Sequence, residues 1–145
     1  IIRPSNAYGP NQKDFFLIPE IINKLKRKKI IINNINIKRD LIYVSDLVDA
    51  IIKSISLKSK FEILNVGSGK SYGIRKIINV LQKISGVYSP IKNKNLYKSN
   101  EIFSTRLNIN RAKKILKWKP SYSLEKGLRN TIYKRSLLKE WVLKN

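Results

Sequence analysis

Apolar positions along this chain follow two patterns, which together predict an α/β fold. Short apolar blocks of the kind that form strands lie at 1–3, 29–32, 41–44 and 61–66. Apolar residues at helical spacing lie in 15–28, 45–55, 73–85, 110–117 and 124–143. We expect an irregular loop over 4–14 and mostly extended, irregular chain over 87–100. The whole is too short for a complete doubly wound sheet.

The helix expected over 45–55 has a distinct start and a distinct apolar side. Ser45 stands where an N-cap belongs, and Asp46 in the first turn would favour the helix dipole. We expect the apolar side to be buried, and it comprises Leu47, Val48, Ile51, Ile52 and Ile55.

Composition excludes several kinds of chemistry. The 145 residues include no Cys and no His, which removes thiol nucleophiles, histidine bases and zinc sites built on these ligands. The lack of Cys fits a reducing compartment, so we expect a cytoplasmic protein. No apolar run approaches ~18 residues, so we expect no membrane span. Because the chain has no Met and begins at Ile1, we expect a fragment or a processed chain.

The formal charge of +22 raises nucleic-acid binding as an alternative function. The basic residues are 23 Lys and 8 Arg, whereas specific base contacts favour Arg. They are also spread over nearly every segment, together with many Asn and Ile, and Lys, Asn and Ile all have A/T-rich codons. We therefore favour biased codon usage over a nucleic-acid site and expect no specific nucleic-acid partner.

The stretch over 62–81 contains a glycine turn that partly matches two phosphate-binding motifs. A P-loop needs a Gly five positions before Gly69, where this chain has Leu64. A dinucleotide-binding turn needs an acidic residue about 20 positions later, and no Asp or Glu lies between Glu62 and Glu101. We interpret the stretch as a tight turn between a strand and a helix.

The same stretch holds a Tyr-x-x-x-Lys pair, Tyr72 and Lys76, which has the spacing of a proton-transfer couple. Such pairs arise often by chance in a chain rich in both residues. We favour a loop tyrosine and a solvated lysine.

Four segments, in order, carry a family resemblance. They are "RPSNAYGPNQ" (3–12), "RDLIYVSDLVDAI" (39–51), "ILNVGSGKSYGI" (63–74) and "LNINRAKKILKWKPSYSLEKGL" (107–128). Together they resemble the C-terminal part of the NAD-dependent epimerase/dehydratase family, the extended short-chain dehydrogenases that act on nucleotide sugars. Within that family, the sequence is most similar to UDP-glucose 4-epimerase-like enzymes.

The resemblance implies an α/β fold made of the end of the Rossmann sheet plus a small substrate-binding lobe, over all of 1–145. Family members carry a Gly-rich NAD turn and a catalytic Tyr-x-x-x-Lys upstream of the segment that opens this chain. The resemblance therefore implies that the N-terminal NAD-binding half and all catalytic residues are absent. NAD would serve the intact parent, a homodimer, and this chain alone would bind none.

The resemblance also implies a substrate, a nucleotide sugar with UDP as the expected nucleotide. It does not separate an epimerase from a dehydratase. It implies five polar or backbone contacts. Asn6 matches the residue at the sugar–diphosphate, Arg39 the arginine on the diphosphate, and Pro4 a backbone site beside the nicotinamide. Lys98 stands where members have a second phosphate-binding Arg, and Glu101 where they have an Asp that holds the ribose hydroxyls. Planar bidentate contacts make Arg suited to a diphosphate, and a carboxylate suits a diol.

Three apolar residues complete the site that the resemblance implies. Leu17 matches a residue beside the nucleotide, Ile32 ends a strand that flanks the base, and Ile74 matches a wall of the nucleoside pocket.

Three of the polar residues also have a purely structural explanation. Arg39 next to Asp40 fits a surface ion pair, Asn6 fits a cap of the following turn, and Lys98 fits a solvated lysine. The family's usual Leu-Gly-Trp has Lys117 in its middle position here. Such departures fit A/T drift or a decayed, non-enzymatic remnant, and the sequence alone leaves both open.

Overall fold

The computed structural model describes residues 1–25, 29–58, 61–97 and 99–144, with side chains of the last helix described as far as Arg135. The strands are β1 (Ile2–Pro4), β2 (Asn6–Tyr8), β3 (Ile30–Ile32), β4 (Lys38–Arg39), β5 (Leu41–Tyr43), β6 (Leu64–Val66), β7 (Tyr72–Gly73) and β8 (Ile91–Asn93). The helices are α1 (Leu17–Leu25), α2 (Val44–Ile55), α3 (Ile74–Ser85), α4 (Asn110–Leu116) and α5 (Leu124–Lys144). The predicted α/β class is confirmed.

The strands pair two by two. β1 pairs with β6, β2 with β5 and β3 with β8, all in parallel, while β4 and β7 pair antiparallel. Only Ser5 separates β1 from β2, and only Asp40 separates β4 from β5, so two extended stretches of chain link the pairs. The predicted loop over 4–14 is therefore wrong in part, because Asn6–Tyr8 form a strand.

Two apolar cores hold these elements together. One lies among α1, β3, α3 and the start of α5, and its fully enclosed members include Ile18, Ile21, Ile30, Ile77, Ile78, Leu81 and Leu128. The other lies among β5, α2, β6 and α4, and its members are Ile42, Ala50, Leu64, Val66, Ile109, Ala112, Leu116 and Trp118.

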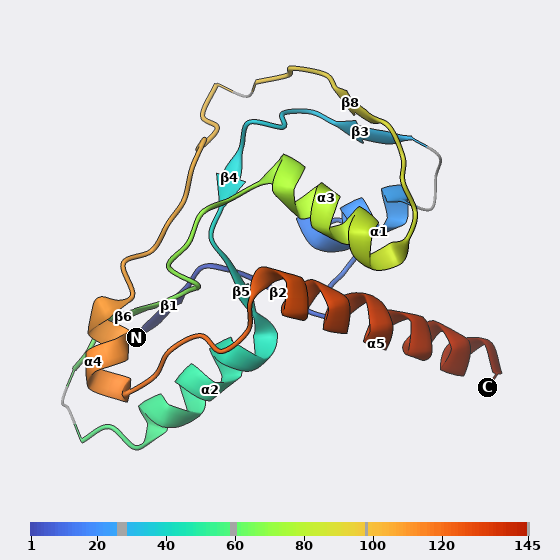
Figure 1. Ribbon diagram of the computed structural model, residues 1–145. Helices are drawn as coiled ribbons and strands as arrows, with labels where there is room; N and C mark the ends of the chain where they lie inside the picture. Colours follow the sequence, from blue (N-terminus) through green and yellow to red (C-terminus); the bar gives the residue numbers. More distant parts are fainter. Residues whose placement is uncertain (26–28, 59–60, 98, 145) are drawn as a thin grey trace.

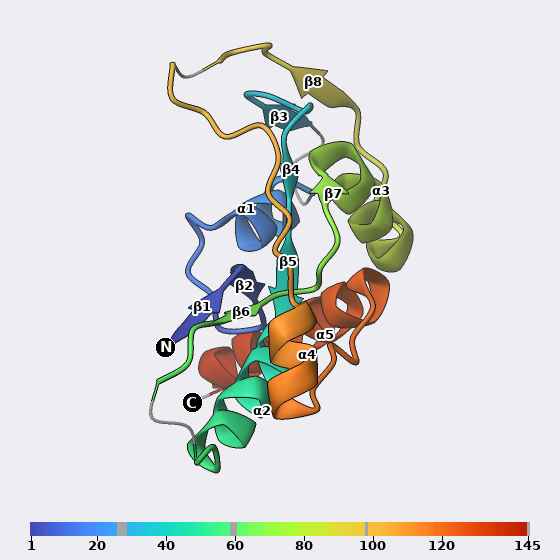
Figure 2. The ribbon, with the colours of Figure 1, turned by 90° about the vertical axis from the view of Figure 1, so that its left-hand side faces the viewer.

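The two cores lie at different ends of the molecule. Figure 1 shows α2 and α4 together at one end, and α1 and α3 beneath the β3–β8 pair at the other. The view in Figure 2, turned by 90°, keeps this separation, with β4 and β5 running between the two ends. Helix α5 starts beside β5 and extends away from the body toward the C-terminus (Figure 1).

Helix α2 departs most from its predicted form. It begins at Val44, preceded by Tyr43 in an extended conformation with no side-chain cap, so the predicted N-cap at Ser45 is wrong. The predicted buried side is wrong as well, because its exposed fractions are 46% for Val48, 43% for Ile51, 59% for Ile52 and 78% for Ile55. Of the five predicted residues only Leu47 is partly buried.

The opposite side of α2 explains this orientation. Asp46 and Ala50 are the buried residues of the helix. The Asp46 carboxylate accepts hydrogen bonds from the backbone N–H and hydroxyl of Ser121, at 2.9 and 2.7 Å, and from the N–H of Tyr122 at 3.1 Å. The indole N–H of Trp118 donates to the Asp46 carbonyl at 3.1 Å. These bonds turn the acidic side of α2 inward, so its apolar side faces out.

Candidate functional site

Arg39 lies in β4 and is half-buried. Its guanidinium donates to the carbonyl of Lys38 at 2.9 Å and to that of Ile102 at 2.6 Å. The second bond spans 63 positions and holds β4 against the segment that follows β8. The alternative explanation of Arg39 as a surface partner of Asp40 is wrong, because Asp40 is completely buried and its carboxylate binds other groups.

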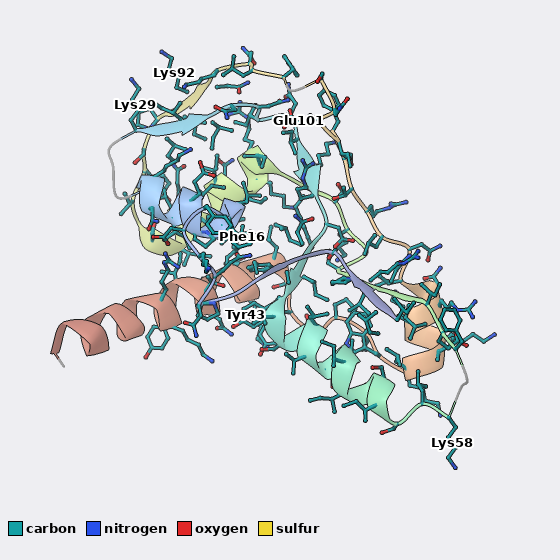
Figure 3. The ribbon with its side chains drawn as sticks, turned by 180° about the vertical axis from the view of Figure 1, so that it is seen from behind. Phe16, Lys29, Tyr43, Lys58, Lys92 and Glu101 are labelled. Atoms are coloured by element: carbon teal, nitrogen blue, oxygen red, sulfur yellow. The ribbon has the colours of Figure 1, made fainter. Side chains whose placement is uncertain are left out.

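Glu101 lies on the segment that Arg39 contacts. Its carboxylate accepts a hydrogen bond from the side-chain amide of Asn34 at 3.2 Å. Asn34 is itself buried and follows the end of β3. Figure 3 shows Glu101 beside the chain that connects β3 with β4. The structure thus brings Arg39 and Glu101 to neighbouring positions, while Lys98 lies outside the described residues.

The three predicted apolar residues belong to one core. Ile32 and Ile74 are 8% and 4% exposed, and Leu17 packs against the same cluster from the first position of α1. The backbone N–H of Ile74 donates to the carbonyl of Ile37 at 3.1 Å, which ties the start of α3 to the chain before β4. The predicted nucleoside wall is therefore contiguous with the strand that carries Arg39.

Pro4 and Asn6 have exposed side chains on β1 and β2. The Asn6 backbone N–H donates to the Asp40 carbonyl at 3.2 Å. Its side chain makes no hydrogen bond with the described residues, so the proposed turn-capping role has no support in this part of the chain. Asn6 remains a predicted substrate contact and Pro4 a predicted cofactor contact.

The glycine turn at 67–69 does hold an anion, but the anion is the chain's own Asp40. One carboxylate oxygen accepts from the backbone N–H and hydroxyl of Ser68, at 2.8 and 2.7 Å. The other accepts from the N–H groups of Gly69 at 3.2 Å and Leu107 at 3.0 Å. Because these N–H groups are already used, they offer no cradle for a phosphate, and the interpretation as a structural turn is supported.

Tyr72 and Lys76 do not have the geometry of a proton-transfer pair. The Lys76 ammonium lies over the ring face of Tyr72, 5.7 Å from its centroid. Burial, and next the negative charge of Asp40, raise the pKa of the Tyr72 phenol above its ordinary value. A tyrosine that takes a proton near neutral pH needs a lowered pKa, so this pair does not fit a general base.

Three other features of the described residues bear on possible functions: their acidic side chains, their helices and their positive charge. No three of their acidic side chains gather to hold a metal ion. None of the helices, over the described residues, has both the length and the apolar character needed to cross a bilayer. Positive charge is widely spread, since Figure 3 shows Lys29 and Lys92 at one end of the molecule and Lys58 at the other.

The chain is similar in sequence to several proteins named as enzymes of nucleotide sugars. Residues 1–67 match the model of the NAD dependent epimerase/dehydratase family. The chain is 33% identical over 138 residues to the dTDP-4-dehydro-6-deoxyglucose reductase of Escherichia coli, covering 88% of this chain and 42% of that protein. It is 30% identical over 135 residues to the UDP-glucuronate 4-epimerase of Thermodesulfobacterium geofontis, and the match covers 91% of this chain and 41% of that protein.

A solved structure supports the same placement. The fold matches a variant of the UDP-glucuronic acid 4-epimerase from Bacillus cereus, solved with UDP-4-deoxy-4-fluoro-glucuronic acid and NAD, at a TM-score of 0.81 and 27% identity. The match covers 94% of this chain and 45% of that one. The chain thus spans less than half the length of its relatives, which agrees with a C-terminal portion. The resemblance of this chain to the NAD-dependent epimerase/dehydratase family is confirmed.

Proposed function

We propose that this chain is the nucleotide-sugar binding part of an NAD-dependent epimerase or dehydratase. The observation that carries the proposal is the bond from Arg39 to the carbonyl of Ile102. It brings a fixed guanidinium beside the segment of Glu101 and next to the apolar wall of Ile32 and Ile74. A cation, a carboxylate and an apolar wall are the three features that a nucleoside diphosphate requires.

Each residue would have a distinct part in binding. Arg39 is held by two carbonyl bonds, so its fork needs little ordering to engage two phosphate oxygens. Glu101 would accept from the ribose hydroxyls, Ile32 and Ile74 would line the nucleoside, and Asn6 would contact the sugar–diphosphate. The UDP-sugar bound by the Bacillus cereus relative supports UDP as the nucleotide. The lobe would position the sugar for hydride transfer to NAD, which the rest of the enzyme would bind.

This function needs an NAD-binding half, and we propose that it packs on the exposed side of α2. The relatives are more than twice as long as the region that this chain matches, so more than half of each relative lies outside that region. The exposed apolar side of α2 would be covered by such a half. Four neighbouring side chains form this side, and we call Val48, Ile51, Ile52 and Ile55 the outer face of α2.

Two further features support docking at this place. Among the described strands, β1 pairs only with β6, so its other edge is open to a further parallel strand. A pocket of about 220 Å³ lies between β1 and the end of α2, and Phe61 on its rim is 67% exposed. An open strand edge beside an apolar helix face fits one more βα unit of a parallel sheet.

The nucleotide site can be tested by calorimetric titration of UDP into this chain. We expect Arg39→Ala to weaken UDP binding about tenfold or more, the range for a hydrogen bond to a charged group. Arg129→Ala is the matched control, because Arg129 lies on α5 and pairs with Glu125. Equal UDP affinity of parent and Arg39→Ala would overturn the phosphate assignment.

With NAD and UDP-glucose we expect this chain alone to give no turnover.

Docking on α2 can be tested by cysteine labelling, because the chain contains no Cys. A maleimide should label Ile52→Cys quickly in this chain and slowly in a longer chain that includes the coding sequence upstream of Ile1. Lys53→Cys, an exposed position nearer the acidic side of α2, should label quickly in both. Equal labelling of Ile52→Cys in the two chains would contradict this docking.

A further inference from the structure

A groove between helix α3 and strand β4 carries four cations. Its volume is about 590 Å³. Lys38 enters it from β4, and Arg75, Lys76 and Lys83 enter it from α3. None of its described lining residues is Asp or Glu.

These cations are not neutralised within the described part of the chain. Neither the guanidinium of Arg75 nor the ammonium groups of Lys38 and Lys83 have a hydrogen-bond or ion-pair partner among the described residues. Lys76 has only the ring of Tyr72. Five other basic side chains of the described residues have carboxylate partners, and none of the four groove cations is among them. Like charges around one groove repel each other and favour a bound anion.

The shape of the groove follows from a glycine. Gly73 pairs with Lys38 across the β4–β7 ladder, and a Cβ at Gly73 would meet no atom within 4 Å. Its φ of −70° is open to any residue, so the backbone does not require glycine there. The missing side chain leaves open space directly opposite the Lys38 stem. Ile35, which is buried, and Val80, which is half-buried, supply an apolar wall.

We propose that this groove binds a polyphosphate group, either inorganic or carried by a nucleotide. A triphosphate has a negative charge that the four cations match. Arg75 can engage two phosphate oxygens, while the lysines act as point charges. The side-chain amides of Asn36 and Asn79 also line the groove and can donate to phosphate oxygens. If the polyphosphate belongs to a nucleotide, the base can pack against the apolar wall.

The groove is separate from the nucleotide-sugar site. Lys38 and Arg39 are consecutive in β4, so their side chains project to opposite faces of the strand. On α3, the side with Ile74, Ile77 and Ile78 is buried, and the groove residues lie on the other side. Binding here would therefore be a second function, and it does not depend on the proposed one.

Titration calorimetry of tripolyphosphate, and separately of ATP, tests the groove at about 0.15 M salt, where dispersed surface charge is screened. We expect Lys38→Gln/Lys83→Gln to weaken tripolyphosphate binding at least about tenfold. Lys114→Gln/Lys119→Gln removes the same charge from exposed positions on and after α4 and should change it less than about twofold. Arg39→Ala should also leave it within about twofold, which separates this site from the nucleotide-sugar site.

A second variant tests the groove without changing its charge. Gly73→Leu fills the open space at a backbone conformation that leucine accepts, and it should weaken binding at least about fivefold. Unchanged binding by Gly73→Leu, or equal losses in the two double-lysine variants, would show dispersed charge attraction and overturn the proposal. If ATP binds more tightly than tripolyphosphate, the ligand of the groove is a nucleotide. If tripolyphosphate binds more tightly than ATP, the ligand is inorganic polyphosphate.

Discussion

Helices α2 and α3 have the same length, 12 residues each, and opposite surroundings. In α3 the apolar residues Ile74, Ile77, Ile78 and Leu81 are between 0% and 4% exposed. In α2 the outer face is between 43% and 78% exposed. Both helices show apolar residues at helical spacing, so spacing identifies an apolar side without showing what covers it.

The two helices are also fixed by different forces. Helix α3 packs through its apolar side between α1, α5 and β7. Helix α2 is fixed by its acidic side, where Asp46 binds the chain at 121–122. A helix fastened by a buried carboxylate keeps its apolar side available for another partner.

The largest expected effect is on the covered helix. Ile77→Ala in α3 should lower the free energy of unfolding by about 2–5 kcal/mol, because Ile77 is fully buried and its truncation leaves a cavity. Ile52→Ala makes the same chemical change on α2, where the side chain is 59% exposed, and should cost less than about 0.5 kcal/mol. Urea unfolding of both variants measures the difference. Equal costs would mean that the outer face of α2 is covered in solution.

The second-largest expected effect on stability comes from the buried carboxylate of Asp46, which holds α2 in place. Asp46→Ala removes the acceptor for three hydrogen bonds and leaves the N–H groups of Ser121 and Tyr122 without a partner. We expect a loss of about 1.5–3 kcal/mol in unfolding free energy. Asp49→Ala is the control, since Asp49 is exposed and pairs with Lys53 at 3.6 Å, a contact of little energetic value. A loss as small for Asp46→Ala as for the control would contradict its fastening role.

Much of the secondary structure was predictable because the signals are local. The helix expected over 73–85 ends where expected, at a glycine, since Gly86 follows α3 with a φ of 69°, a left-handed conformation that favours glycine. The helix expected over 15–28 is present as α1, which begins at Leu17, and its Pro19 lies in the first turn, where no backbone N–H is needed. The start of α2 was predicted wrongly because Ser45 lies inside the helix, and its orientation was predicted wrongly because the partners of Asp46 lie 75 positions away.

The candidate site was predictable only through family resemblance. Nothing local to Arg39 indicates that its guanidinium reaches a carbonyl 63 positions away. The role of Asp40 was missed for the same reason, since its partners Ser68 and Leu107 are distant in sequence. The four groove cations could not be recognised among the 31 basic residues, because the sequence does not show which of them line the same groove.

A close contact at α5 sharpens the contrast further. A Cβ at Gly127 would overlap the hydroxyl of Tyr8 and lie 3.2 Å from the ring of Tyr43. Tyr8 is only 3% exposed, and this burial raises the pKa of its phenol. Gly127→Ala should therefore cost about 1–3 kcal/mol through overpacking, measured as a fall in thermal midpoint. Gly73→Ala, whose Cβ would meet nothing, is the control and should change stability little.

The smallest expected effect on stability, and the most direct test of the outer face, comes from Ile51→Thr/Ile52→Thr. Both side chains are exposed, so the free energy of unfolding should stay within about 0.5 kcal/mol of the parent for each substitution. Binding of a hydrophobic dye, and self-association measured by light scattering, should both fall, because exposed apolar patches drive them. Val87→Thr, which removes a similarly exposed apolar side chain that follows α3 and lies outside the outer face of α2, should leave both unchanged. If the α2 variant binds dye as strongly as the parent, the outer face is already covered in this chain, and the contrast between α2 and α3 is lost.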